Sequence, residues 1–155
     1  MAKNETKLVF GDLFGIPLIN GNLGIAQIIE QMMTNIYYVA ITNIQISKNE
    51  TTIPKINKDN IISLIAVTKH PFKNNTYQKL GNYIPLAEKK DFKNEKTKYS
   101  NYVGAKHYDA VLISDFLNAY FALTPWDRWH DPNYLDKNFL ITNEKKPENL
   151  IYTKK

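Results

Sequence analysis

Cysteine is absent from this chain of 155 residues. Its absence excludes a disulfide framework, a zinc–thiolate site and a thiol nucleophile. No apolar run approaches the ~20 residues that a membrane-spanning helix needs. The polar residues 1–7 are not followed by the apolar core of a signal peptide. We therefore expect a soluble, cytoplasmic protein without a membrane partner.

Arginine is nearly absent as well, because Arg128 is the only one and every other basic residue is lysine. The net charge of +5 and the pI of about 9.2 suggest nucleic-acid binding. However, the lysines are scattered among acidic residues, and lysine lacks the planar guanidinium that recognises bases and phosphates. The pattern favours a solvated lysine surface, so nucleic acid is not an expected partner. A small basic nucleic-acid-binding barrel remains an alternative.

The sequence also lacks a catalytic or metal-binding pattern with a suitable spacing. His70, His107 and His130 form no helical i, i+4 pair, and no nucleophile elbow or phosphate-binding loop is present. The nearest approach to a ligand set is His130 with Asp127 and Asp131. Adjacent side chains rarely face the same ion, and a catalytic zinc site needs three protein ligands. We expect no metal, no cofactor and no enzymatic activity.

The composition predicts a folded chain. Hydrophobic residues make up 43% of the sequence, including ten Tyr and seven Phe, which argues against disorder. A chain of this length has the size of one domain and can bury a sizeable core. We expect a single domain over residues 1–155, with residues 1–6 and 154–155 mobile at its ends.

Most of the predicted elements are strands. Two apolar-rich runs, residues 7–18 and 23–31, flank Asn20-Gly21, the preferred centre of a two-residue hairpin turn. Gly11-Asp12 within the first run suggests a bulge or a bend. Further strands are expected from β-branched, aromatic or compact apolar runs. These are residues 37–46, 61–68, 80–86 and 108–113, with 139–142 and 150–153 as edge strands.

One short helix is expected after residue 113. Ser114 is a suitable N-cap, and Phe116, Leu117, Tyr120 and Phe121 then fall on one helical face, before Pro125 ends the helix. Residues 47–60 predict a loop, and the charged residues 88–101 predict a loop or a poor helix. The expected fold is α+β and strand-dominated. It is either a curled antiparallel sheet or an SH3-like barrel with one short packed helix.

Residues 124–137, here called the Trp-rich segment, contain both tryptophans, Trp126 and Trp129, and the only arginine. Trp and Arg are the residues most enriched at binding hot spots. Pro125 and Pro132 restrict the backbone. Composition leaves two roles open, a core plug or a contact surface. We expect Trp126 to be structural.

Four other residues of the Trp-rich segment are predicted to contact a partner. The residues concerned are Asp127, Arg128, Trp129 and Asp131. Across residues 124–136 the three aspartates and one arginine give a local charge of −3 + 1 = −2. An acidic patch on a basic protein is a feature that could guide docking.

Two stretches together resemble the immunity protein 26 family of bacterial toxin systems. The first is residues 11–18, Gly-Asp-Leu-Phe-Gly-Ile-Pro-Leu, followed by Asn20-Gly21 and then Gly-Ile-Ala-Gln-Ile at residues 24–28. The second is the Trp-rich segment followed by Lys145-Lys146-Pro147. The similarity covers both ends of the chain and is weak between about residues 47 and 100.

The resemblance implies an α+β protein that binds a toxin made by the same cell and neutralises it by stoichiometric occlusion. The implied partner is this cognate toxin, and the family has no catalytic residues to transfer. The motif positions expected to be structural are Gly11, Asp12, Pro17, Gly21, Trp126 and Pro132. Some related chains carry a phosphotriesterase label, so a metal-dependent hydrolase is kept as an alternative.

Overall fold

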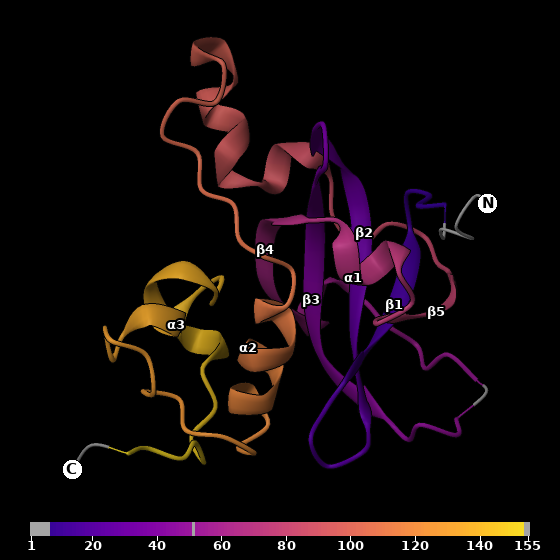
Figure 1. Ribbon diagram of the computed structural model, residues 1–155, viewed down its shortest axis with the longest axis vertical. Coiled ribbons are helices and arrows are strands. Elements are labelled where there is room, and N and C mark those ends of the chain that lie inside the picture. Colours follow the sequence, from indigo (N-terminus) through magenta and orange to yellow (C-terminus); the bar gives the residue numbers. More distant parts are fainter. Residues whose placement is uncertain (1–6, 51, 154–155) are drawn as a thin grey trace.

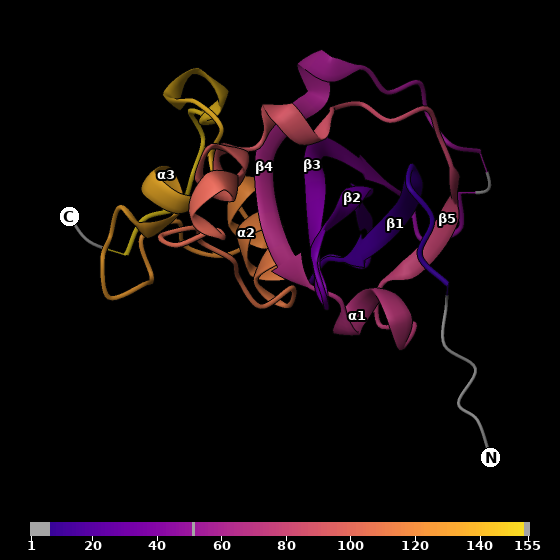
Figure 2. The same ribbon diagram turned by 90° about the horizontal axis from the view of Figure 1, so that it is seen from above.

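The computed structural model describes residues 7–50 and 52–153, and its main element is a five-stranded antiparallel sheet in the order β4-β3-β2-β1-β5. The strands are β1 Asp12–Pro17, β2 Leu23–Met33, β3 Ile36–Ile46, β4 Ile61–Thr68 and β5 Gln78–Asn82. Figures 1 and 2 show that the sheet curls strongly. Within the described residues no ladder joins its two edges, β4 and β5. The predicted α+β class is confirmed, as a curled sheet and not a closed barrel.

The β1–β2 hairpin forms where it was predicted, but its loop is longer by one residue. The Leu18 N–H donates to the Asn22 carbonyl at 2.9 Å, and the Gly21 N–H donates to the Leu18 carbonyl at 3.0 Å. These bonds enclose a three-residue loop, in which Gly21 takes a φ of +89°. The Asn22 N–H also donates to the Asn20 side chain at 3.0 Å. The predicted two-residue turn was wrong because Asn20 serves as a side-chain acceptor and not as a left-handed residue.

Replacing Gly21 with valine is expected to lower the free energy of unfolding by about 1 kcal/mol, because a branched side chain is strained at positive φ. A Cβ atom at this position would meet nothing within 4 Å, so the loss would come from the backbone alone. Thermal unfolding measures it as a fall of roughly 2–4 °C in the melting temperature. Gly21→Asn is the matched control and should lose less, since asparagine tolerates positive φ. Equal melting temperatures for wild type and Gly21→Val would contradict the assigned turn.

Both faces of the sheet are buried, because the curled strands present alternate side chains to two separate cores. In β2, Ala26 and Ile28 enter a first core that also holds Phe116 and Trp126. Ile25 and Ile29 enter a second core. That second core also contains Tyr38, Leu86 and Phe92. The near-continuous apolar sequence of β2 follows from this burial on two sides.

The main helix begins earlier than predicted. Helix α2 spans Leu112–Tyr120, and its N-cap is Val111, which lacks a side-chain cap bond, instead of Ser114. Its buried face includes Phe116 and Leu117, as the periodicity predicted. The helix packs closely on β2, since a Cβ atom on Gly24 would lie 2.6 Å from Leu117 Cδ1. The covering of the sheet by α2 is visible in Figure 1.

Three predicted strands do not form. In residues 108–113 only Tyr108 pairs, in a parallel bridge to Val67, before α2 takes over the apolar run. Residues 139–142 and 150–153 form no strand, and each segment makes an isolated backbone hydrogen bond to another part of the chain instead. The Ile141 N–H donates to the Ile62 carbonyl at 2.8 Å, and the Trp126 N–H donates to the Ile151 carbonyl at 2.8 Å. The strand expected over residues 80–86 is β5, which lies slightly earlier.

The other helices are short. They are α1 His70–Lys73, α3 Tyr134–Asn138, and the 3₁₀ helices Lys58–Asn60, Lys89–Asp91, Lys93–Ser100 and Asn143–Lys145. Residues 88–101, predicted as a loop or a poor helix, form two of these 3₁₀ helices. Residues 1–6 and 154–155, whose mobility was predicted, lie outside the described residues.

A candidate partner-binding surface

Trp126 is a core residue at the start of the Trp-rich segment. Its side chain has no exposed area, and its Nε1–H donates to Asp136 Oδ2 at 3.0 Å. Its ring centroid lies 6.0 Å from that of Phe116 on α2, and the Lys146 ammonium lies 5.7 Å from its centroid. The residue thus joins α2 to the C-terminal part of the chain.

Asp127 also points inward, with only 4% of its surface exposed. Its Oδ1 accepts hydrogen bonds from the Thr153 N–H at 2.7 Å and from the Thr153 hydroxyl at 2.9 Å. The carboxylate therefore fixes residue 153 beneath the Trp-rich segment. Any contribution of Asp127 to binding would come through this positioning.

Arg128 and Trp129 reach the surface together. The Arg128 Nη2 lies 3.1 Å from Asp115 Oδ1 on α2, with 42% and 37% of the two side chains exposed. The guanidinium carbon lies 4.9 Å from the Trp129 ring centroid. Trp129 stacks in turn on Tyr134, with 5.8 Å between centroids and 13° between planes. A half-exposed ion pair of this kind contributes only about 0–1 kcal/mol to stability.

Asp131 opens the turn that leads into α3. Its Oδ1 accepts the Asn133 N–H at 2.8 Å, and its Oδ2 lies 2.9 Å from Lys137 Nζ. The bond to the Lys137 ammonium is the main reason that the pKa of Asp131 lies below its usual value. Pro132 follows directly and restricts the backbone of the turn.

The exposed and partly exposed side chains of the segment form a strip that combines aromatic and charged groups. We call it the tryptophan strip and define it as Arg128, Trp129, Asp131, Tyr134 and Lys137. Stacking links its tryptophan to α3, and an ion pair links its aspartate to the same helix. Of the four predicted contact residues, the structure places three in this strip and Asp127 beneath it.

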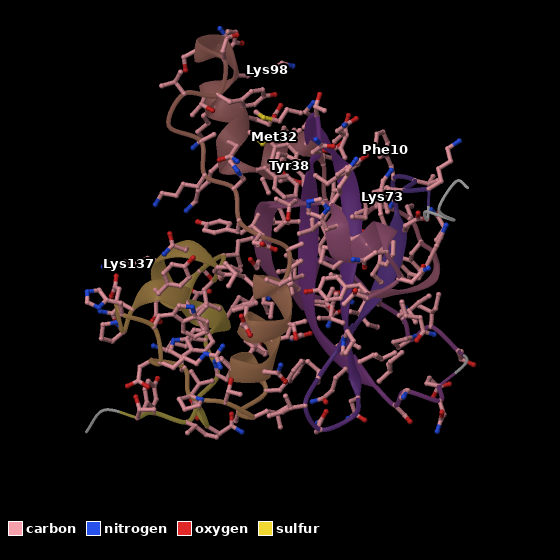
Figure 3. All side chains as sticks on the ribbon, viewed as in Figure 1. Phe10, Met32, Tyr38, Lys73, Lys98 and Lys137 are labelled. Carbon is pink, nitrogen blue, oxygen red and sulfur yellow. The ribbon has the colours of Figure 1, made fainter. Side chains whose placement is uncertain are left out.

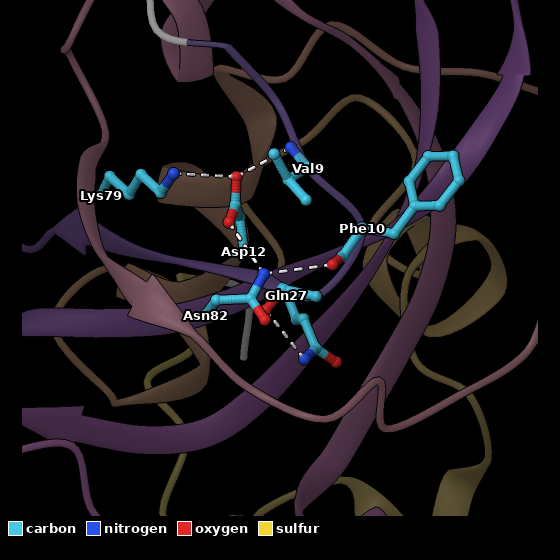
Figure 4. Close-up of polar contacts among 7 residues, drawn as sticks. Val9, Phe10, Asp12, Gln27, Lys79 and Asn82 are labelled. Carbon is cyan, nitrogen blue, oxygen red and sulfur yellow. Dashed lines mark hydrogen bonds and ion pairs between the residues drawn. The ribbon is translucent and has the colours of Figure 1, made fainter.

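The Gly11-Asp12 motif lies at the other side of the sheet, where it ties β1 to β5 (Figure 4). Asp12 is 1% exposed, and its Oδ2 accepts the Val9 N–H at 2.8 Å and lies 3.3 Å from Lys79 Nζ. Its Oδ1 accepts a hydrogen bond from Asn82 Nδ2 at 3.0 Å. The motif therefore anchors the start of the sheet.

Gln27 is the buried polar residue that holds the segment after β5, and sequence reasoning missed this role. It has no exposed area. Its Nε2 donates to the carbonyls of Gly11, Tyr83 and Ile84 at 3.2, 3.1 and 3.1 Å. Its Oε1 accepts the Leu86 N–H at 2.8 Å. Gln27 thus contacts four backbone groups from two segments, its two amide hydrogens being shared among three carbonyls.

Gly11 is fixed by the same contacts, since its φ is +95° and a Cβ atom would lie 2.5 Å from the Tyr83 carbonyl oxygen. The other two motif positions of the first stretch lie at the β1–β2 hairpin. Pro17 ends β1, and its carbonyl accepts the Ser114 hydroxyl at 3.1 Å. Gly21 forms the turn described above. Gly11, Pro17 and Gly21 therefore each fix the path of the backbone at one point.

Residues 88–106 form a projecting arm, drawn above the sheet in Figure 1. The arm contains six lysines and three acidic residues, a local charge of +6 − 3 = +3. Tyr99 is fully exposed at 100%, and Val103 is 74% exposed. Figure 3 shows Lys98 in the outer part of the arm and Tyr38 of β3 beneath it.

The arm is attached to the sheet through Tyr38. The ring of Phe92 stacks on that of Tyr38 with centroids 4.3 Å apart. Glu95 Oε2 accepts the hydroxyls of Tyr38 at 2.6 Å and of Tyr102 at 3.2 Å. Burial and the bond to Glu95 raise the pKa of Tyr38 above its usual range, so the hydroxyl stays protonated and remains a donor.

The sequence model of the family described as Immunity protein 26 matches this chain over residues 10–102, which is more than half of it. The chain belongs to the Immunity protein 26 family. No curated protein and no solved structure matches it. The matched region contains the Gly11-Asp12 motif, Gln27 and most of the arm. It also covers residues 47–100, where the resemblance of the sequence to the family was weak. It ends before the Trp-rich segment, which therefore lies outside the family match.

The described residues of this Immunity protein 26 family member contain no group of three or more His, Cys, Asp or Glu side chains that could hold a metal ion. Its predicted lack of metal and of catalysis remains a prediction. In the part of the chain that the structure describes, no helix is long and apolar enough to cross a membrane.

Proposed function

We propose that this Immunity protein 26 family member binds a cognate toxin in the cytoplasm of the cell that makes it and neutralises the toxin by stoichiometric occlusion. Membership of the family is the observation that carries the proposal. Occlusion requires a stable interface of roughly 800 Å² per partner with a few aromatic or arginine anchors. It requires no reaction by the inhibitor itself.

We place the first contact of the toxin on the tryptophan strip. Arg128 is held above Trp129 and beside Asp115, so little side-chain entropy is lost when a partner binds. Trp129 is partly exposed over Tyr134 and offers a flat apolar surface. Asp131 adds a carboxylate that a basic group can approach. Buried Trp126 and Asp127 support the strip from below.

Replacing Arg128 with alanine is expected to leave the melting temperature almost unchanged, because the lost ion pair is half-exposed. The same change should weaken toxin binding by roughly tenfold or more, since arginines at interface centres are hot spots. The test pairs the chain with a candidate toxin, taken from the genes that lie beside its own. Binding is measured by calorimetry, and protection by the growth of cells that express the toxin.

Lys48→Ala is the matched control. Lys48 is an exposed cation in the loop after β3, which lies on the far side of the sheet from α3 (Figures 1 and 2). It should retain full binding and protection. If Arg128→Ala binds as tightly as the wild type, the tryptophan strip is not the docking surface. If the wild-type chain does not protect against the neighbouring toxin, the proposed function is wrong.

A further inference from the structure

A cavity of about 300 Å³ lies beside the edge strand β4, between the base of the arm and α3. Its volume is at the lower end of the range for ligand pockets, roughly 300–1,000 Å³. Leu64 and Ala66 of β4 form one wall. Lys93 and Lys106 of the arm form a second wall, and Lys137 of α3 forms a third. The cavity therefore lies where three separate parts of the chain meet.

The β4 edge has unpaired backbone groups in this cavity. The Tyr108 N–H donates to the Ala66 carbonyl at 2.9 Å, and the Ile141 N–H donates to the Ile62 carbonyl at 2.8 Å. The register between β3 and β4 is regular around Leu64, so alternation turns its N–H and carbonyl outward, as for Ala66. No described residue pairs with the Leu64 groups. Leu64 therefore offers one outward N–H and one outward carbonyl between these two occupied positions, enough to pair with a single residue of an incoming extended segment.

The charge in the cavity has one sign. Three lysines line it and no Asp or Glu does, and since Lys137 is paired with Asp131, Lys93 and Lys106 carry the positive charge that an occupant would meet. The nearby Glu95 of the arm already accepts bonds from two tyrosine hydroxyls. Lys106 Nζ has only a long contact of 3.5 Å to Asn138 Oδ1. An occupant with a carboxylate would therefore be attracted, and a cationic one repelled.

We propose that the cavity binds an acidic side chain on an extended segment of the toxin. The backbone of that segment would bond to Leu64, and its Asp or Glu carboxylate would meet the ammonium groups of Lys93 and Lys106. This inference rests on the proposed function. The Lys137–Asp131 ion pair connects the cavity to the tryptophan strip, so one partner can cover both.

A short blocked peptide of alternating glutamate and valine is the probe for this site. Amide NMR spectra of the full chain should show saturable shifts at Leu64, Ala66 and Lys106. The same peptide with glutamine in place of glutamate should bind about tenfold more weakly, as should the glutamate peptide to the double variant Lys93→Gln/Lys106→Gln. Both lysines are exposed, so the variant should fold normally. Added salt should weaken binding of the glutamate peptide to the wild-type chain, because it screens the attraction between the carboxylates and the lysines.

Inorganic phosphate separates a peptide site from a simple anion site. If phosphate reproduces all the shifts and the peptide adds none at Leu64, the proposal is overturned. Shifts confined to another surface overturn it as well. In cells, if the wild-type chain protects against the neighbouring toxin and the double variant protects equally, the cavity proposal fails while the function stands. If the wild type does not protect, the function fails, and the cavity loses its proposed toxin occupant.

Discussion

Replacing Trp126 with alanine should lower the free energy of unfolding by about 3–5 kcal/mol, which is the cost of a large cavity in a packed core. The side chain is fully buried, and the loss also removes its hydrogen bond to Asp136. Urea unfolding of the purified chain measures the change as a fall in the midpoint at unchanged slope. A variant too unstable to purify would agree with this expectation.

Two further substitutions show where the loss originates. Trp126→Phe retains most of the ring volume but cannot donate to Asp136, so it should cost clearly less than Trp126→Ala. Trp129→Ala removes a partly exposed ring and should also cost less. If Trp126→Ala and Trp129→Ala were equally stable, the assignment of one tryptophan to the core and the other to the surface would be wrong.

Replacing Gln27 with leucine should lower the free energy of unfolding by about 2–4 kcal/mol. The change leaves the carbonyls of Tyr83 and Ile84 and the Leu86 N–H without their partner, at about 1 kcal/mol or more for each orphaned group. Hydrogen exchange should locate the damage. Protection of the backbone amide against exchange should fall at Leu86 before it falls in β3.

Gln27→Glu has nearly the same shape and tests the donor role of the amide. An ionised carboxylate facing the Gly11, Tyr83 and Ile84 carbonyls is repelled, so folding should raise the pKa of the new carboxyl. A carboxyl with a raised pKa in the folded state loses stability as pH rises. The deficit relative to wild type should therefore be larger at neutral than at acidic pH. A pH-independent deficit would show that the amide does not donate to these carbonyls.

The sequence was sufficient to predict strands whose local pattern agrees with their tertiary environment. β3 and β4 are β-branched and apolar, and both were found with nearly their observed limits. Residues 108–113 were misassigned because a short apolar run suits a strand and the first turn of a buried helix equally well. The α3 helix has five residues and is held by tertiary contacts, so no local signal could predict it.

The candidate surfaces were predictable only in part. The Trp-rich segment was conspicuous because it contains rare residues, and a buried Trp126 was expected from the sequence. Asp127 was expected at the surface but is buried, because it bonds to Thr153, which lies 26 residues away along the chain. The bonding role of Gln27 was not predicted, because three of its four backbone partners lie more than fifty residues away along the chain. The lysine-lined cavity combines β4, the arm and α3, and nothing in the sequence indicated that these three meet.

The two ends of the arm's outer loop lie next to each other, so the outer part of the arm is a suitable position for inserting a foreign sequence. The Asn94 side chain donates to the Lys106 carbonyl at 2.7 Å and accepts the Lys106 N–H at 3.2 Å, so the two ends of the outer loop are adjacent. The 3₁₀ helix that follows Phe92 contains no buried residue. Exposed loops with adjacent ends tolerate insertions well. A foreign epitope or recognition loop placed over residues 96–101 would leave both cores of the sheet intact.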